Sequence, residues 1–405
     1  MVYSFFSQLV WLALQCLTPF NKKIKDFVRG RKHVLEDSLT DVIWFHCASV
    51  GEFEQARPLI EFIKSENAKE KIVVTFFSPS GYNNFKNYRL ADHVSYLPFD
   101  TPNQVSKFLN YFRPKVLMLI KYEFWPNLIR LTKKNETPIY SVASIFRKEQ
   151  RFFGSFGQLF LSDLKKVKHF FVQNEESKTL LSEAGIKDSS VIGDTRFDRV
   201  IEIAEKSQTI GPVASFCENS NILVAGSTWL PDEKILELCL LELEGWKFIL
   251  APHDVKNSRI QEVKKVFENH SPVVYSGAKS NDFKNAKVLI IDSIGMLNRV
   301  YREADLCYVG GAFGAGLHNI LEAAVYGKPI IHGPKIDKFK EAEDLLKKGG
   351  TFKIENFNTD KNAVLSIFNN PDTRAEMGAI AKEYVYENLG ASLKVISRLK
   401  QDSIL

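Results

Sequence analysis

The feature that most constrains the fold is a repeated alternation of short apolar runs with stretches of helical pattern, which begins near residue 42. Runs rich in Val, Ile, Leu and Phe, without a polar residue at every second position, are typical of strands that are buried on both faces. When helices separate such strands, the strands form a parallel sheet covered by helices on either side. In the first half of the chain these runs are residues 42–48, 71–77, 115–120, 138–144 and 169–173.

The alternation starts afresh in the second half, with strand-like runs at residues 221–227, 246–253, 272–277, 287–292, 306–311 and 328–334. The preceding stretch, 208–220, is interpreted as a linker, and 373–401 as helical with a break at Gly390. We therefore expect an α/β protein of two doubly wound, Rossmann-like domains, residues 33–208 and 209–385, facing a cleft. A C-terminal helix, 386–405, is expected to pack back on the first domain. Ligands of parallel sheets bind beyond the carboxyl ends of the strands, so the chemistry is expected in those loops.

Composition and charge narrow the class of protein. The 405 residues carry a formal net charge of +6, which is too small to indicate nucleic acid but compatible with an anionic small molecule or a lipid surface. The five cysteines are scattered and never form a C-x-x-C pair, which favours a reduced, cytosolic setting without a disulfide framework. Histidines are few and isolated and no Asp-x-Asp pair is present, so we expect no metal ion. We also expect no cofactor and, given the small net charge, no nucleic-acid partner.

The N-terminal segment 1–32 is unusually apolar and is followed by positive charge. Residues 2–20 are largely apolar and aromatic, but Ser4, Ser7, Gln8 and Gln15 make them marginal for a membrane span. The charges follow the apolar run instead of preceding it, which argues against a cleaved signal peptide. We predict a helix that lies on or is anchored in an anionic membrane surface; the alternative is a helix packed on the protein's own core. The basic residues are Lys22, Lys23, Lys25, Arg29, Arg31 and Lys32.

Residues 45–60, FHCASVGEFEQARPLI, place an acid where a buried strand turns into a helix. The strand pattern breaks at Ser49 to Gly51, and the helical pattern opens on Glu52. A carboxylate in a first helical turn is favoured by the helix dipole, so Glu52 reads as a cap. The same position after a parallel strand suits a catalytic base. Both interpretations are left open by this stretch alone.

A second acid, Glu123, follows the strand-like run 115–120 and precedes Trp125 and Pro126, where a new helix opens. Positive charges lie in this and a neighbouring strand-end loop. They predict either a solvated basic face or a site for a phosphate-bearing acceptor. These residues are Lys121, Arg147, Lys148 and Arg151.

The stretch 305–334, DLCYVGGAFGAGLHNILEAAVYGKPIIHGP, carries the strongest signal in the second half. A strand ends in Gly310 and Gly311, and a helix is expected from about residue 317 to Gly327, with His318 and Glu322 on one face. A glycine-rich loop that leads into a helix can bind an anion, and a carboxylate can accept both hydroxyls of a ribose. The loop lacks the spacing of dinucleotide-binding and P-loop motifs. It therefore predicts a nucleotide site of another kind.

Other strand-end loops converge on the same edge of the second sheet. Gly226, Ser227 and Thr228 end one strand with small donors suited to phosphate, and His253 follows the next. Residues 290–297 form a further loop that could contact a base through backbone groups. Each signal is weak alone, since a strand-end Ser or His is commonly a cap.

Taken in order, several blocks between about residues 42 and 345 resemble those of the 3-deoxy-D-manno-octulosonic acid (Kdo) transferases. The N-terminal segment is similar to that family's membrane anchor. Two features depart from the family pattern: Arg147 is displaced from the family's arginine, and Leu317 precedes His318 in the glycine-rich loop. The blocks are 48–52 (ASVGE), 121–129 (KYEFWPNLI), 171–185, 191–198 (VIGDTRFD), 225–228 (AGST), 251–253 (APH) and 308–334.

The resemblance implies a GT-B glycosyltransferase that moves Kdo from CMP-Kdo to a lipid A precursor, with inversion and without a metal. It implies work at the cytoplasmic face of a Gram-negative inner membrane, in lipopolysaccharide biosynthesis. Glu52 would be the general base and Glu123 a second carboxylate. The expected CMP-sugar residues are Gly226, Ser227, Thr228, His253, Gly310, Gly311, His318, Asn319 and Glu322, and the expected acceptor residues are Ser49, Gly51, Lys121 and Arg147. A different GT-B enzyme acting on UDP-sugars, or a non-catalytic nucleotide-sugar binder, remains the alternative.

Overall fold

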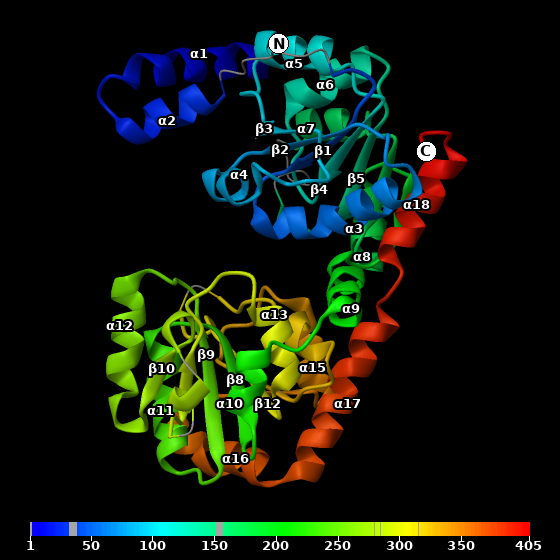
Figure 1. The fold of residues 1–405 in the computed structure, drawn as a ribbon. Helices are drawn as coiled ribbons and strands as arrows, with labels where there is room; N and C mark the ends of the chain where they lie inside the picture. The colour runs from blue at the N-terminus through cyan, green and yellow to red at the C-terminus, as the bar shows by residue number, and fades with distance from the viewer. Residues whose placement is uncertain (1, 32–38, 151–156, 279, 284, 315) are drawn as a thin grey trace. The chain divides into compact units, whose positions relative to one another are not determined.

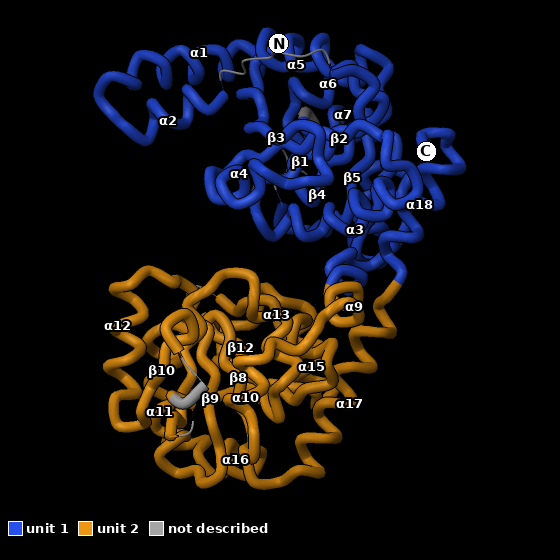
Figure 2. Tube along the Cα trace, viewed as in Figure 1, with its two compact units in different colours: residues 1–199, 390–405 blue, residues 200–389 orange. Residues whose placement is uncertain are grey.

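The computed structural model describes residues 2–31, 39–150, 157–278, 280–283, 285–314 and 316–405. The chain divides into two compact units, residues 1–199 with 390–405 (unit 1) and residues 200–389 (unit 2) (Figure 2). The chain thus leaves unit 1 after residue 199 and returns to it at residue 390. The sequence had suggested that these boundaries lie at residues 208 and 386. Lys32, Arg151 and the expected domain start at residue 33 fall outside the described residues.

Unit 1 contains a parallel sheet whose strands lie in the order β3-β2-β1-β4-β5-β6-β7. All five strands predicted in this half are present. The edge strands β3 and β7 were not predicted, because they are short, half-buried and partly polar. The strands are β1 (Ile43–Cys47), β2 (Ile72–Phe76), β3 (His93–Tyr96), β4 (Val116–Ile120), β5 (Ile139–Ser144), β6 (His169–Val172) and β7 (Ser189–Val191).

Helices cover both faces of this sheet, which explains why its central strands are buried at every position. Along β1, Ile43, Phe45 and Cys47 pack in one apolar cluster, and Trp44 packs in another on the opposite face. The helices of unit 1 are α1 (Val2–Leu17), α2 (Lys22–Gly30), α3 (Val50–Glu66), α4 (Pro79–Phe85), α5 (Pro102–Phe112), α6 (Pro126–Lys134), α7 (Gln158–Leu164), α8 (Glu175–Glu183), the first turn of α9 (Arg196–Lys206) and α18 (Ala391–Gln401).

Unit 2 repeats the architecture, with strands in the order β10-β11-β9-β8-β12-β13-β14, all parallel (Figure 1). The six predicted strands are present, and the short edge strand β14 was missed. The strands are β8 (Asn221–Thr228), β9 (Trp246–Pro252), β10 (Pro272–Val274), β11 (Val288–Ile290), β12 (Leu306–Val309), β13 (Ile330–His332) and β14 (Thr351–Lys353).

The interpretation of residues 208–220 as a linker is wrong. Residues Gly211–Cys217 form helix α10, and the side chains of Val213 and Phe216 are fully buried in unit 2. Pro212 misled the interpretation, although proline is favoured in a first helical turn. The other α-helices of unit 2 are α11 (Leu230–Leu241), α12 (Asn257–Val266), α13 (Leu297–Val300), α14 (Leu321–Ala324), α15 (Lys340–Lys348), α16 (Phe357–Asn369) and α17 (Pro371–Glu387).

The strand order of each sheet reverses once, and the reversal positions the candidate site loops. In unit 1 the chain runs from β1 through α3 to β2 on one side, and from β4 through α6 to β5 on the other. Loops that leave adjacent strands in opposite directions leave a crevice at the carboxyl edge. The reversal therefore brings together residues 48–52 and 121–125. In unit 2, β8 and β12 are the corresponding pair, with loops 226–229 and 310–319.

Helices α1 and α2 form a hairpin that docks on unit 1 through one face of α1 (Figure 1). The hydroxyl of Ser4 donates to Asn127 Oδ1 (2.6 Å), Asn127 Nδ2 donates to Ser7 Oγ (3.2 Å), and the Trp11 ring stacks on Phe99. The serines that made this segment marginal for a membrane span therefore dock the helix. The opposite side of the hairpin exposes large apolar side chains: Val2, Phe5, Phe6, Leu9, Leu12, Leu17 and Phe20.

One of the basic residues in this region points inward. The guanidinium of Arg31 is buried over the rings of Phe27 and Phe77 and donates to the Phe77 carbonyl oxygen (2.8 Å). Burial lowers the pKa of Arg31 to about 10. Arg31 thus anchors the hairpin, whereas Lys22, Lys23 and Arg29 are exposed. Among the described helices, none is both long enough and apolar enough to cross a bilayer.

Helix α18 returns the chain to unit 1 and packs against α3. The predicted break at Gly390 is confirmed: its φ is +103°, in the region that favours glycine, and α18 begins at the next residue. The carboxylate of Asp198 accepts the N–H groups of Gly390 and Ser392 (both 2.6 Å), which caps the helix. Ala391, Val395 and Leu399 complete the apolar cluster that contains α3.

We expect Leu399→Ala to destabilise unit 1 by about 2–5 kcal/mol, because the side chain is 1% exposed and its removal leaves a cavity under α18. Leu393→Ala, on the same helix but 58% exposed, should change the stability by less than about 0.5 kcal/mol. Urea unfolding followed by circular dichroism measures both variants. Equal effects would contradict the docking of α18.

Candidate active site

Glu52 lies in the first turn of α3, directly after β1, and its side chain is buried. The N-cap residue Ser49 makes no side-chain capping bond; instead, a Glu52 carboxylate oxygen accepts the Ala48 N–H. The carboxylate therefore ties the first turn of α3 back to the end of β1. Burial, followed by the charge of Glu123, raises the pKa of Glu52 to about 6, and the bond from Ala48 only partly offsets this.

Glu123 lies in the loop after β4, and its carboxylate is held by two ring nitrogens. Its Oε2 accepts Trp125 Nε1–H (2.9 Å) and lies 3.3 Å from His46 Nε2. Burial alone would raise the pKa of Glu123, but the hydrogen bond and charge of His46 and the Trp125 bond outweigh it and lower the pKa. Two neighbouring carboxyls whose environments push their pKa values apart are a common arrangement in acid–base catalysis.

His46 belongs to the candidate site, although the sequence interpretation did not include it. It lies near the carboxyl end of the buried strand β1, where a histidine is ordinarily a core residue. Its ring has no exposure, and Nδ1 faces the side-chain and backbone oxygens of Thr75 on β2 (3.0 and 3.1 Å). The available signal was its place six residues before Glu52, at the carboxyl end of the same strand.

The expected acceptor residues lie on the same edge of unit 1. Lys121 has a positive φ of 60°, and its charge lowers the pKa of Glu52. Arg147 is exposed; burial raises the pKa of Tyr122, the charge of Arg147 lowers it and Glu52 raises it, so both residues act on one ring. Gly51 faces open space, with no atom within 4 Å of a Cβ placed there, and Ser49 is half-buried beside it.

In unit 2, Gly226, Ser227 and Thr228 form a strained strand end. Ser227 adopts a φ of 54° where the register with β9 shifts, and a Cβ at Gly226 would lie 1.9 Å from the Tyr301 hydroxyl. Strained residues of this kind cluster at functional sites. Thr228 is buried, and its hydroxyl donates to Glu233 (2.8 Å), so this side chain is fixed inside the protein.

Three rings stack beside this strand end. The Trp229 and His253 rings lie 4.6 Å apart at 23°, and the His253 and His318 rings lie 4.6 Å apart at 32°. Burial, and then the charge of His253, lowers the pKa of His318 to about 4, so this imidazole is neutral at physiological pH. Trp229 was not predicted, although an exposed tryptophan after a strand-end Ser-Thr was a visible signal.

Asp232 ties the loop after β8 to the glycine-rich loop after β12. Its Oδ2 accepts the N–H groups of Trp229 (2.8 Å) and Gly311 (3.1 Å), and its Oδ1 accepts the Tyr308 hydroxyl (2.8 Å). Gly310 lies so close to the Ser227 carbonyl that a Cβ would meet it at 2.5 Å. Asp232 reads as an ordinary first-turn acid in the sequence, so its role in joining the two loops was missed.

The predicted helix start near residue 317 is wrong. Helix α14 spans only Leu321–Ala324, and His318 precedes it, so His318 and Glu322 do not share a helix face. Asn319 Oδ1 accepts the Leu321 N–H (3.3 Å), and Asn319 Nδ2 donates to Glu322 Oε1 (3.0 Å). This side-chain turn stops the helix from extending further back. A helix this short has only a small dipole. The groups of this loop that are available to bind a ligand are therefore its polar side chains and backbone N–H groups.

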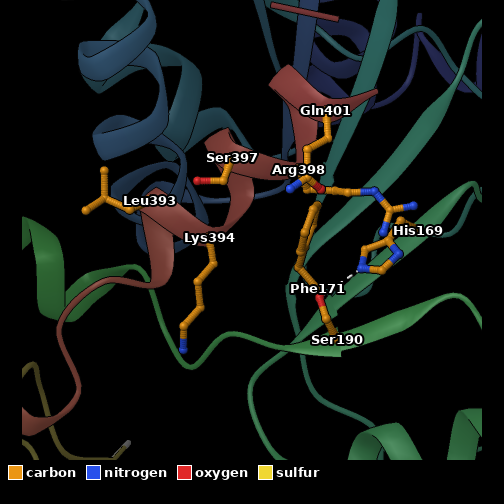
Figure 3. A pocket seen from close by; sticks show the side chains of 8 residues that line it. All are labelled: His169, Phe171, Ser190, Leu393, Lys394, Ser397, Arg398 and Gln401. Atoms are coloured by element: carbon orange, nitrogen blue, oxygen red, sulfur yellow. Dashed lines mark hydrogen bonds between the residues drawn. The ribbon is translucent and has the colours of Figure 1, made fainter. Parts of the chain in front are cut away.

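A separate pocket of about 400 Å³ lies in unit 1 between α18 and strands β6 and β7 (Figure 3). His169, at its wall, bonds to Ser190 through Nε2 (2.8 Å), and none of the predicted site residues lines it. Within the ranges that the structure describes, no group of three or more His, Cys, Asp or Glu side chains is arranged to hold a metal ion. Metal independence stays a prediction.

One protein family and several named proteins are similar to this chain. A family described as 3-deoxy-D-manno-octulosonic-acid transferase (kdotransferase) matches residues 23–199. The chain is 29% identical over 323 residues to the 3-deoxy-D-manno-octulosonic acid transferase of Aquifex aeolicus, covering 78% of this chain and 82% of that protein. It is 27% identical over 394 residues to a bifunctional glycosyltransferase/methyltransferase of Fusobacterium nucleatum, covering 92% of this chain but 60% of that longer protein.

A solved structure shows the same fold at low sequence identity. The UDP-GlcNAc 2-epimerase of Neisseria meningitidis, bound to UDP-GlcNAc, aligns with a TM-score of 0.57 and 15% identity, over 87% of this chain and 99% of that one. This likeness shows the two-unit α/β fold of GT-B enzymes and nothing about the substrate. The matched family and the relatives lead to one conclusion: the chain is a glycosyltransferase, and its residues 23–199 form a domain of the 3-deoxy-D-manno-octulosonic acid transferase family.

Proposed function

We propose that the chain transfers Kdo from CMP-Kdo to a lipid A precursor, with inversion, without a metal ion and with Glu52 as the general base. The observation that carries this proposal is the pair of carboxyls, buried Glu52 and half-buried Glu123, at the strand-order reversal of the unit that the transferase family matches. The raised pKa of Glu52 suits a base that must take a proton near neutral pH.

The reaction would be a single displacement. A sugar hydroxyl of the acceptor gives its proton to Glu52 while its oxygen attacks the anomeric carbon of Kdo. The bond from that carbon to the CMP phosphate oxygen breaks, and the phosphate leaves with the electron pair. Attack from the side opposite the leaving group inverts the carbon. A correctly placed base contributes about 10²–10⁴-fold to such a step.

Glu123 would act as the second acceptor-side carboxylate. His46 and Trp125 keep Glu123 ionised, and its charge raises the pKa of Glu52. Its carboxylate can also accept a hydrogen bond from a hydroxyl of the lipid A precursor. The positive charges of Lys121 and Arg147 would attract the phosphate of the lipid A precursor. Gly51, which faces open space, and Ser49 would leave room for its sugar.

The loops of unit 2 would hold CMP-Kdo. Ser227, the N–H groups of Gly310 and Gly311, and the ring nitrogens of His253 and His318 offer donors for the phosphate, in place of a metal ion. Asn319 and Glu322 would bind the ribose hydroxyls. Gly226 and Thr228 would serve by shaping the strand end, since Gly226 admits no side chain and the Thr228 hydroxyl is already engaged.

The hairpin α1–α2 would place the protein on the cytoplasmic face of the inner membrane, where a lipid acceptor lies. Its apolar side chains are exposed and the lysines of α2 lie close by in the sequence, a combination that favours insertion into the headgroup region of an anionic leaflet. The docking of α1 on unit 1 through Ser4 and Ser7 supports a peripheral attachment.

We expect Glu52→Gln to bind CMP and to transfer no measurable Kdo, because an amide cannot take the proton. A radiolabelled CMP-Kdo transfer assay on lipid A precursor measures this. Glu54→Gln, two residues along α3 and paired with Arg57, is the matched control and should stay within about threefold of wild type. Near-normal transfer by Glu52→Gln would overturn the role of Glu52. Thermal protection of the wild type by UDP instead of CMP would indicate a UDP-sugar enzyme.

Glu52→Gln should also change the pH dependence of stability. Between pH 4.5 and about 6 the folded state retains a proton on Glu52 that the unfolded state has lost, so wild-type stability falls as pH rises through this window. Glutamine has no such loss, and the variant should gain up to about 2 kcal/mol relative to wild type from pH 4 to pH 7. Urea unfolding across this pH range measures the difference; a gain in the opposite direction would contradict the raised pKa.

Replacing Phe5 and Phe6, each 65% exposed, with serine should weaken binding to vesicles that contain phosphatidylglycerol by on the order of 100-fold. The matched control is the double change of Leu238 and Leu241 to serine, which alters two exposed apolar residues on α11. Co-sedimentation with vesicles measures both. Equal loss in the two variants would indicate nonspecific adhesion in place of attachment through α1.

A further inference from the structure

We propose that His46 is a positioning residue that donates Nε2–H to Glu123, and that the Thr75 hydroxyl fixes the tautomer that makes this possible. The inference rests on the proposed function of Glu123 and Glu52, and it concerns residues outside the predicted site. The residues form a chain of contacts across three neighbouring strands: Trp44 and His46 on β1, Thr75 on β2, and Glu123 with Trp125 after β4.

The direction of each hydrogen bond follows from what each group can give. The indole Nε1–H of Trp44 can only donate, so Thr75 Oγ1 accepts it (2.9 Å). Thr75 is fully buried, and its own hydroxyl hydrogen needs an acceptor. The acceptor that the structure provides is His46 Nδ1, 3.0 Å away. This nitrogen therefore carries no hydrogen in the neutral ring, and Nε2 carries it.

The other side of the ring selects the same tautomer. An ionised carboxylate can only accept, so Glu123 Oε2, 3.3 Å from His46 Nε2, requires Nε2–H. A doubly protonated ring would keep this donor as well. In the Nδ1–H tautomer, Nδ1 could donate to the Thr75 carbonyl oxygen, 3.1 Å away. Only this tautomer would present the lone pair of Nε2 to the carboxylate. The Thr75 carbonyl oxygen favours Nδ1–H and Glu123 favours Nε2–H; the Thr75 hydroxyl, which donates to Nδ1, adds the interaction that decides between these two neutral forms.

Glu123 thereby receives two donors, His46 Nε2–H and Trp125 Nε1–H, on one oxygen. Loss of the His46 donor would let Glu123 bind a proton at higher pH. The Glu52–Glu123 pair would then hold two protons in the pH range where wild-type activity rises. The other titratable groups whose charges bear on this pair are Cys47, Lys121 and Tyr122, and Tyr122 in turn is affected by Arg147, Asp194 and Arg196.

The first test measures the tautomer and needs no activity. The protein has eight histidines, and ¹⁵N-histidine spectra distinguish Nδ1–H from Nε2–H; the His46 signal is assigned by its loss in His46→Asn. We expect Nε2–H in the wild type and a shift to Nδ1–H in Thr75→Val, whose backbone carbonyl is then the remaining partner of Nδ1. Nδ1–H in the wild type would overturn the proposal.

The second test is the pH profile of kcat/KM for Kdo transfer. The acid limb of this profile is the pH range over which kcat/KM rises as carboxyl protons are lost. In Thr75→Val this limb should move to higher pH by about one unit, and kcat/KM at pH 6 should fall about tenfold. The limb should also become steeper, because both Glu52 and Glu123 must then lose a proton. Thr75→Ser should return the limb to the wild-type position. Trp125→Phe, which removes the other donor outside the core, should move the limb in the same direction as Thr75→Val.

A purely structural role predicts a different outcome. Thr132 is equally buried in unit 1, and its hydroxyl has no hydrogen-bond partner among the described residues, so Thr132→Val is the matched control that should leave the limb in place. A uniform fall in activity with no movement of the limb in Thr75→Val and Trp125→Phe would refute the positioning role. Absence of Kdo transfer by the wild type would refute the proposed function, and the tautomer would still decide the role of His46.

Discussion

The parallel direction of all strands in both sheets is the constraint on which the rest of the structure depends. A parallel strand can follow another only through a crossover, so helices cover both faces, the central strands of unit 1 are buried along their length, and every strand ends at the same edge. The single reversal of strand order, between β1 and β4 and between β8 and β12, opens that edge at one point in each unit. Glu52 and Glu123 lie at the first reversal, and the serine–threonine and glycine-rich loops lie at the second.

At the first reversal, stability and the proposed chemistry act on the same side chain. The Glu52 carboxylate accepts the Ala48 N–H, which is a favourable interaction, while burial and the nearby Glu123 make its charged form costly. The hydrogen bond holds the carboxylate in place, and the cost of the charged form raises its affinity for a proton. His46 and Trp125 have the opposite effect on Glu123: they lower its pKa and keep it ionised. The asymmetry of two adjacent carboxyls thus comes from three neighbouring strands, not from the acids themselves.

The structural features that depend on the sequence of a short segment alone were predicted well. Continuous apolar runs identified the central strands, and Gly390 marked the break before α18, since a residue with positive φ favours glycine. The short edge strands β3, β7 and β14 were missed because they are only partly buried and carry polar residues. The helix expected from residue 317 was too long because an Asn319 turn competes with the backbone, and that competition depends on Glu322. Arg31 was expected on the basic surface, yet it lies over two aromatic rings contributed by distant segments.

By itself the sequence determined the fold class and the resemblance to the transferase family, and it predicted the loops that are proposed to carry the chemistry, because strand apolarity, turn residues and strand-end motifs are local properties. Tertiary structure decided which side chains act together. Whether Glu52 is charged depends on Glu123, the state of Glu123 depends on His46, and the His46 tautomer depends on Thr75, which lies 29 residues further along the chain and pairs with it across two strands. Such couplings fall off within a few ångströms, so they exist only once the strands are aligned, and no spacing along the chain encodes them directly.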